Sequence, residues 1–419
     1  MSALKKRAGK KENGSLNLLR GLLLCFLVIF FVFQDLFQTT LPPLKYMDEL
    51  FAAALFPILI LVLFRKNLHY QITKRSLLII FLIIALWFTG YYGFVRNRYQ
   101  PLGSTLRDSV ACVKYFMSIG TSCLIFIDSD LKKMQKLLWK CLGGVTLCLF
   151  VLCIADLGLH IFPGGHRYGL RTVRLFYTSF SQLATMCLFL CVIYLRLFEF
   201  YRDRILPWLC MLFFVIAWTM RIKAFMGVIC VLFAYIRICR MRRPIGPLAW
   251  SLMGVSGIAI GIRQFRYYFE TVESARKLLT KESIIIARDY FPFGTGWGTF
   301  GSAFSGNPYS PVYRMYNLDD VWGLTRDYYA FVADTFWPMI LAQCGFVGAV
   351  LYVLILVLLA LEVFSLGRKN AYAMASGLVS LLYLVIASTS ESAFVNTYAV
   401  PYAFWLGVLF AGNRKSDSK

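Results

Sequence analysis

Long apolar runs dominate this chain and predict its architecture. Runs of about 18 to 23 mostly apolar residues recur along it, and each is long enough to cross a hydrocarbon core of roughly 30 Å as a helix. The pattern predicts about twelve membrane spans, at residues 16–36, 47–64, 76–95, 108–127, 136–156, 175–196, 205–219, 222–237, 246–262, 338–361, 372–389 and 395–411. The predicted fold is therefore an all-α, polytopic integral membrane protein.

One long connection, residues 263–337, differs from the others because it is rich in both charged and aromatic side chains. From Arg263 to Ile286 its apolar residues recur every three or four positions, which predicts an amphipathic helix lying along the outer leaflet. Pro292 ends this helix, and the glycines that follow allow the backbone to approach another element closely. The chain thus divides into an N-terminal bundle of about nine helices, the long external loop, and about three C-terminal helices with a tail, at residues 1–262, 263–337 and 338–419.

Composition and charge support a membrane protein and exclude other classes. Charged residues make up 16% of the chain, whereas soluble domains carry about 25%. The formal net charge is +23, and most basic residues lie in alternate short connections, which is the positive-inside pattern of a protein with both termini in the cytoplasm. We therefore expect a plasma membrane protein whose long loop faces outward. No basic domain is large enough to follow a phosphate backbone, so we expect no nucleic-acid partner.

The cysteine and histidine residues do not predict a metal site. Most of the 12 cysteines lie inside apolar runs and no Cys-x-x-Cys pair is present, so neither a disulfide framework nor a zinc site is indicated. His160 and His166 lie on the predicted outer side with Asp156, but their spacing matches no zinc signature. We expect no bound metal.

A second group of basic residues departs from the positive-inside trend by lying on the predicted outer side. Arginines near bilayer depth are unfavourable unless they are paired, so these residues are solvated, bound to lipid headgroups, or gathered around a shared anionic ligand. The candidates for such a ligand site are Arg167, Arg171, Arg174, Arg221, Arg276 and Arg288.

Aromatic and acidic residues crowd together in the second half of the long loop. Tyrosine and tryptophan are typical of a membrane interface, but their flat faces also suit stacking against sugar rings, while carboxylates suit the hydroxyl groups. The candidate glycan-binding residues are Trp322 and Asp320, with Gly296 and Trp297 of the glycine-rich turn. The alternative for this turn is a tight backbone turn that binds no ligand.

The order of these features resembles the O-antigen ligase and polymerase superfamily, and Wzy-type polysaccharide polymerases in particular. Many spans are followed by an arginine just inside an outer turn, then by a late external loop with an arginine-bearing helix, a Pro-x-Gly-x-Gly-x-Gly turn and a polar residue at the head of the next span. The residues concerned are Arg221 within 218–224, the turn 292–298, and Asp334 with Gly345. The resemblance covers the topology of the whole chain, with the short motifs lying between about residues 167 and 348.

The resemblance implies a GT-C-like fold and a metal-independent glycosyltransferase that needs no cofactor. External arginines of that family bind the pyrophosphate of a polyprenyl-linked glycan, and Arg221 and Arg276 are the best matches by position. The implied reaction transfers the growing glycan from a polyprenyl-pyrophosphate carrier onto an incoming lipid-linked repeat unit at the outer face of the plasma membrane. The implied partners are the lipid-linked oligosaccharide and membrane lipids, with a chain-length regulator and a flippase as candidate accessory proteins.

The same chemistry needs a carboxylate as well as cations. Planar guanidinium groups suit phosphate oxygens and stabilise the charge of a departing diphosphate, while the acceptor hydroxyl needs a group that takes its proton. Asp334 heads a predicted span and is the first candidate, and Glu391, at the outer end of the eleventh span, is the second. Either carboxylate could equally be a structural partner of an arginine.

Two other functions remain open. A ligase of the same superfamily would attach the glycan to another acceptor, but that branch has a histidine where this chain has Asp334. A flippase or other secondary transporter would also fit about twelve spans. The chain shows no internal repeat, however, and apart from Lys114 its charges lie at the outer boundary rather than in mid-span.

Overall fold

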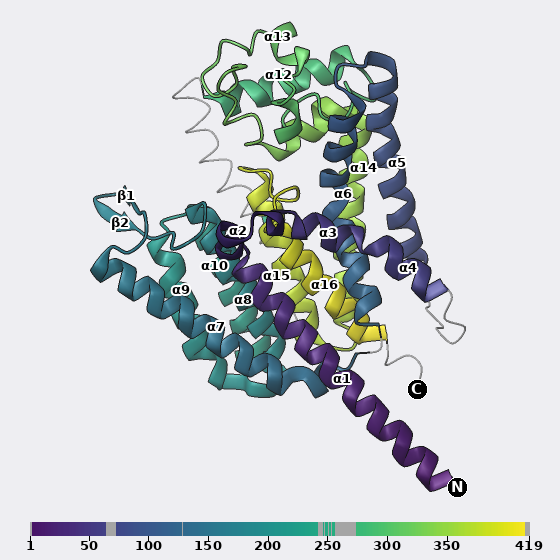
Figure 1. The fold of residues 1–419 in the computed structure, drawn as a ribbon, viewed down its shortest axis with the longest axis vertical. Coiled ribbons are helices and arrows are strands. Elements are labelled where there is room, and N and C mark those ends of the chain that lie inside the picture. Colours follow the sequence, from purple (N-terminus) through teal and green to yellow (C-terminus); the bar gives the residue numbers. More distant parts are fainter. Residues whose placement is uncertain are drawn as a thin grey trace.

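The computed structural model describes residues 2–63, 73–127, 129–241 and 274–414, together with 246, 248, 249, 251, 252, 254 and 255. This part of the chain is almost entirely helical (Figure 1). Its first half contains α1 (Ser2–Val32), α2 (Gln34–Thr40), η1 (Pro42–Tyr46), α3 (Met47–Ala53), α4 (Leu55–Leu63), α5 (Lys74–Asn97), α6 (Leu102–Ile125) and α7 (Leu131–Leu159).

A two-stranded antiparallel hairpin follows α7. It consists of β1 (Gly165–Arg167) and β2 (Leu170–Thr172), with His166 opposite Arg171. The remaining elements are α8 (Phe180–Tyr201), η2 (Arg202–Ile205), α9 (Leu206–Trp218), α10 (Ile222–Ala234), η3 (Tyr235–Arg240), α12 (Ala275–Asp289), η4 (Ala303–Ser305), α13 (Pro311–Met315), α14 (Phe336–Leu366), α15 (Ala371–Ser388) and α16 (Ala399–Arg414).

The apolar helices support a membrane-embedded protein. Within the described ranges, five helical segments are long and apolar enough to cross a bilayer: α5, α7, the segment Phe180–Trp218 that contains α8, η2 and α9, α14 from Trp337, and α15. The pair formed by Leu16–Val32 of α1 and Gln34–Thr40 of α2, bent by 73°, makes a sixth if the two helices are one span. Other predicted spans correspond to shorter helices, such as the 9 residues of α4 and the 13 of α10, or to α6, whose 24 residues are long enough but do not fall in this apolar set. Most of the predicted span 246–262 lies outside the described residues.

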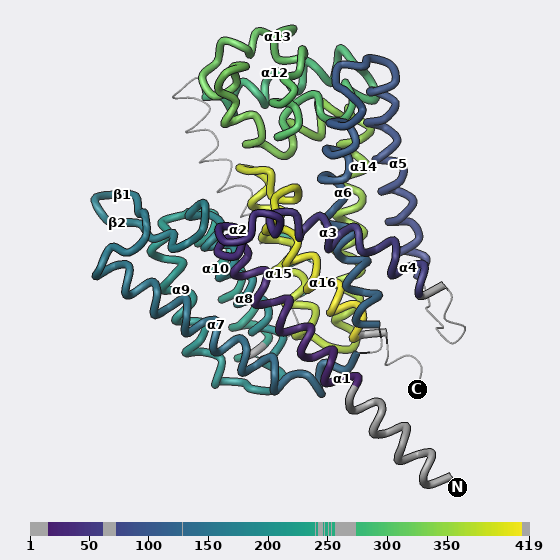
Figure 2. The backbone as a smooth tube through the Cα atoms, in the orientation of Figure 1, coloured from purple at the N-terminus to yellow at the C-terminus, as the bar shows by residue number. Residues whose placement is uncertain are grey.

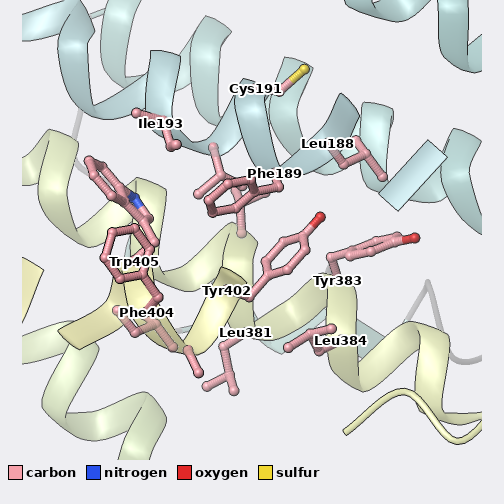
Figure 3. Packing of buried hydrophobic residues seen from close by; sticks show 14 of the residues in the cluster. Leu188, Phe189, Cys191, Ile193, Leu381, Tyr383, Leu384, Tyr402, Phe404 and Trp405 are labelled. Carbon is pink, nitrogen blue, oxygen red and sulfur yellow. The ribbon is translucent and has the colours of Figure 1, made fainter. Parts of the chain in front are cut away.

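The centre of the bundle is packed with aromatic side chains from α8, α15 and α16. Figure 3 shows Phe189 of α8 facing Tyr402 of α16, beside Tyr383 of α15, and the Phe189 and Tyr402 ring centroids are 5.5 Å apart. The tyrosine hydroxyls are satisfied locally, since Tyr402 donates to the Thr185 carbonyl at 2.6 Å and Tyr383 lies 2.6 Å from the Thr185 hydroxyl. Hydrogen-bonded hydroxyls can be buried here at little cost.

Residues 274–335, which we call the external loop after the prediction, form a small helical unit with an apolar core of its own. In Figure 1 it lies beyond the bundle, at the ends of α5, α6 and α14. Ser274 caps α12 by accepting from the Lys277 N–H at 3.3 Å. Leu279 and Ile286 are fully buried on one face of α12, which confirms the predicted amphipathic helix from Ala275 onward. Its apolar face packs into the loop core rather than against lipid, because α14 and the loop offer that face a protein surface. Residues 263–273 lie outside the described part.

The glycine-rich turn is inserted between α5 and α14, which run side by side in Figure 2. Helix α14 is broken at Gly345, where φ is 67° and ψ is −170°. The carbonyls freed by this break are those of Ala342 and Gln343, and they accept from the N–H groups of Thr295 and Gly296 at 2.9 Å each. The predicted close backbone approach of this turn is therefore confirmed.

Glycine is required at position 296 by both conformation and space. Its φ is +106°, and a Cβ atom there would lie 2.5 Å from the Phe94 backbone nitrogen. Real Cβ atoms do not approach backbone that closely, and the backbone of α5 cannot move aside as a flexible side chain can. The next residue, Trp297, fills the space above Gly90, and its Nε1 donates to the Trp87 carbonyl at 3.1 Å.

A buried ion pair joins the short helix α3 to the middle of α6. Lys114 Nζ lies 2.5 Å from Asp48 Oδ2 and 3.7 Å from Glu49 Oε1. The Lys114 and Asp48 side chains are 3% and 0% exposed, so neither charge is compensated by water. Removing one partner of such a pair leaves an uncompensated buried charge, whereas removing both can be close to neutral.

We predict that Lys114→Met lowers the free energy of unfolding by about 3–5 kcal/mol, because Asp48 would be left buried and unpaired. Thermal unfolding of the purified protein in detergent measures the effect. The double variant Lys114→Met with Asp48→Leu should recover most of the loss. A double variant as unstable as the single one would contradict an origin in the pair.

We also predict that Gly296→Ala destabilises the docked loop by about 1–3 kcal/mol, because alanine is strained at positive φ and its Cβ has no space. Gly103→Ala is the matched control, since no atom lies within 4 Å of a Cβ built at that helical glycine. The control should be neutral or slightly stabilising. Limited proteolysis of the external loop compares the two variants, and equal cleavage rates would contradict the prediction.

Candidate functional site

Four charged side chains from four different segments form two ion pairs where the external loop meets the bundle. Arg276, in the first turn of α12, donates from Nε and Nη2 to Asp334 Oδ2 at 3.1 and 2.9 Å. Asp334 lies two residues before the start of α14. Lys223, in the first turn of α10, pairs with Glu391 of the connection between α15 and α16.

The two ion pairs are linked through the backbone next to their carboxylates. The hydroxyl of Ser392, beside Glu391, donates to the carbonyl of Ala333, beside Asp334, at 2.6 Å. Trp337 adds a second link from the start of α14, because its Nε1 donates to the Ser388 hydroxyl at 3.1 Å. The two carboxylates predicted from the sequence are therefore held in one neighbourhood.

Arg221 belongs to the same neighbourhood. Arg221 and Arg276 each lie within Coulombic reach of Lys223. Arg221 is the N-cap residue of α10, and its guanidinium lies over the Phe180 ring, 5.3 Å from the centroid. This cation–π contact holds the guanidinium against the start of α8. We call Arg221, Lys223, Arg276, Asp334 and Glu391 the charge cluster.

The two ion pairs of the charge cluster differ in how accessible they are. The Arg276 and Asp334 side chains are 41% and 31% exposed, whereas those of Lys223 and Glu391 are 17% and 15% exposed. A ligand can therefore reach Arg276 and Asp334 directly. It must lose part of its own hydration shell before it can reach Lys223 and Glu391. Coulombic interactions strengthen as water is excluded, so the inner pair interacts the more strongly with any buried anion.

The other predicted arginines lie around the hairpin or at the far end of α12. Arg167 donates to the Met220 carbonyl at 3.4 Å, which places it beside Arg221. Arg171 pairs with Asp156 at 3.1 Å and also donates to the Phe162 carbonyl. Asp156 lies one helical turn before His160, as the sequence indicated, and its carboxylate pairs with Arg171 of the hairpin.

Like Arg171, two more of the predicted arginines are not brought to the charge cluster by any contact of the described residues. Arg174 donates to the carbonyls of Pro163 and Thr178 at 2.9 and 3.1 Å. Its guanidinium therefore joins the chain segments that precede and follow the hairpin. Arg288 is exposed in the last turn of α12, roughly 18 Å along the helix axis from Arg276.

The four predicted glycan-binding residues fall into two groups. Gly296 and Trp297 are buried between α5 and α14, so we assign them a packing role and do not carry them into the proposed site. Trp322 is 70% exposed, with its ring centroid 5.3 Å from that of Tyr328 and 4.9 Å from that of Phe331. Asp320 is exposed two residues earlier.

Sequence reasoning left Lys223 out of the predicted site. The signal was present, because Lys223 follows Arg221 by two residues on the predicted outer side. Its partner Glu391 is 168 residues away in the chain, so only the folded structure identifies the pair. Lys223 adds a third cation to a site for which the sequence offered arginines alone.

The charge cluster can bind an anion and can accept a proton. Guanidinium groups bind phosphate oxygens in a bidentate manner, and an ammonium adds a compact point charge. Carboxylates next to them can orient a hydroxyl group or take its proton. Three cations and two carboxylates leave one net positive charge in the charge cluster.

The chain was compared with known proteins as a whole. No protein-family model matches it, and no curated protein matches it.

Proposed function

We propose that this protein is a polysaccharide polymerase of the plasma membrane, with about twelve spans and its active site on the outer face. It transfers the growing glycan from a polyprenyl-pyrophosphate carrier onto an incoming lipid-linked repeat unit. The observation that carries this proposal is the charge cluster, in which Arg276 pairs with Asp334 beside Arg221 and the Lys223–Glu391 pair. The resemblance of the loop and its motifs to Wzy-type polymerases supports it.

The proposed reaction is a displacement at the anomeric carbon of the donor glycan. The acceptor hydroxyl oxygen forms the new glycosidic bond while the bond from the anomeric carbon to the diphosphate oxygen breaks. The electron pair leaves with the diphosphate, whose negative charge Arg276, Arg221 and Lys223 stabilise. The hydroxyl proton passes to a carboxylate, for which Asp334 is the first candidate because it is the more exposed of the two.

Donor binding and proton transfer are coupled through the ion pairs. The diphosphate competes with Asp334 for Arg276 and with Glu391 for Lys223, because each cation already has a carboxylate partner. When the diphosphate takes over these cations, the carboxylates lose their counter-charge and become better proton acceptors. The base is thereby activated when the donor is bound.

We predict that Arg276→Gln lowers the rate of glycan transfer about 10²–10³-fold, because one fixed cation facing the leaving group is lost. The rate is measured with purified protein in liposomes that contain the lipid-linked repeat unit. Lys281→Gln, an exposed lysine of the same helix, is the matched control and should polymerise normally.

The products of the same assay separate the polymerase from its alternatives. Loss of a polymerase leaves single repeat units on the carrier, whereas loss of a ligase leaves long chains on the carrier. Wild-type chain lengths from a correctly inserted Arg276→Gln variant would contradict the site, and movement of lipid-linked glycan across the liposome membrane would favour a flippase.

We predict opposite effects on donor binding for the two partners of the outer ion pair. Asp334→Asn should bind a polyprenyl diphosphate more tightly, by up to about tenfold, since Arg276 no longer has a competing carboxylate. The same variant should transfer glycan more slowly because the base is absent. Arg276→Gln should bind the diphosphate more weakly. Weaker binding by both variants, measured by calorimetry, would contradict the competition.

A further inference from the structure

The external loop contains a cavity that lies outside the charge cluster. Its volume is about 280 Å³, and it is lined by Pro308, Tyr309, Pro311, Arg314 and Arg326. None of these residues was predicted to bind a ligand, and none takes part in the proposed transfer. We call this cavity the loop pocket.

Residues that do not line the loop pocket hold its wall in place. The Pro308 carbonyl accepts from Gln100 Nε2 at 2.9 Å, and Gln100 is itself buried. The Tyr309 hydroxyl donates to the Leu324 carbonyl at 2.6 Å, and its ring centroid lies 5.3 Å from that of Tyr313. The apolar face formed by Pro308, Tyr309 and Pro311 is therefore fixed before any ligand arrives, which lowers the entropic cost of binding.

The charged residues that line the loop pocket are both arginines. Arg314 Nε lies 3.6 Å from Asp319 Oδ2, beyond the usual hydrogen-bond distance, and the Arg314 side chain is 74% exposed. Arg326 has no carboxylate partner among the residues that the structure describes. Burial, followed by the charge of Asp319, raises the pKa of Tyr309 to about 12, so its hydroxyl stays neutral at physiological pH. The lining therefore places two guanidinium groups beside an apolar wall, with the Asp319 carboxylate next to Arg314.

We propose that the loop pocket binds a sugar residue that bears a carboxylate, such as a uronic acid. A guanidinium group pairs with a carboxylate in a planar, bidentate geometry, and the rings of tyrosine and proline pack against the C–H face of a pyranose. An inorganic anion would use the arginines but would leave the apolar wall without a partner. The volume suits a single sugar ring, not a longer stretch of glycan.

This inference deepens the proposed function and rests on it for the glycan, since it names the chemical class of the repeat unit. A carboxylate held by Arg314 and Arg326 orients the repeat unit at a second point, separate from the diphosphate. A polymerase needs such a point because diphosphate contacts alone do not distinguish one sugar from another. Specificity follows because a carboxylate gives the two guanidinium groups a charged partner, whereas a neutral sugar gives them none.

The test uses the full chain in lipid nanodiscs and two defined probes, a galacturonic acid trisaccharide and the neutral galactose trisaccharide. We expect the acidic trisaccharide to bind at least about tenfold more tightly to the wild-type protein. The double variant Arg314→Gln with Arg326→Gln should bind both probes equally. Lys281→Gln, on the exposed face of α12, should behave as the wild type, and matched thermal unfolding temperatures show that the variants are folded.

Three results would overturn the inference. These are equal binding of the two trisaccharides by the wild-type protein, unchanged preference in the double variant, and full displacement of the acidic trisaccharide by an equal concentration of inorganic phosphate.

Arg276→Gln separates this inference from the proposed function. If that variant keeps acidic-sugar binding and still polymerises, the assignment of the charge cluster as the transfer site fails and the loop pocket stands. If it stops polymerising while the double variant keeps its sugar preference, only the loop pocket fails.

Discussion

The external loop is joined to the bundle by backbone hydrogen bonds at a break in α14, and the positions of the charged residues depend on this joint. At the break, the carbonyls of Ala342 and Gln343 accept from the glycine-rich turn, and the Val347 N–H donates back to the Pro292 carbonyl at 3.3 Å. Buried backbone groups need partners. The broken helix and the turn therefore satisfy each other, and neither conformation would be stable alone.

The joint determines which parts of the loop lie next to the bundle. Helix α12 precedes the turn and packs on α14, while Asp334 comes just before α14 begins. The two ends of the described loop thus meet, and Arg276 pairs with Asp334 across 58 positions in the chain. The bundle contributes Lys223 and Glu391 to the same border. The ion pairs of the charge cluster are only partly buried at this border. Full burial would require further desolvation of the charged groups, whereas full exposure would weaken the attraction between them.

Several parts of the site were predictable from local patterns and others were not. Arg221, Arg276, Asp334 and Glu391 were each identified from residue type, predicted side and place relative to a span, and the structure brings them into one neighbourhood. Their role in catalysis stays a prediction. Exposure was not predictable, since an aromatic residue after a glycine can face a ligand or the core, and Trp297 is fully buried.

The sequence by itself determined the apolar and mainly helical character of the chain, because hydrophobic length and residue pattern are local properties that add along the chain. It also indicated the close approach of the glycine turn. Only the tertiary structure decided which charges meet, that Lys223 is one of them, and that two arginines line a separate pocket with tyrosine and proline. Such pairings join residues far apart in the chain, and a one-dimensional pattern carries no distance between them.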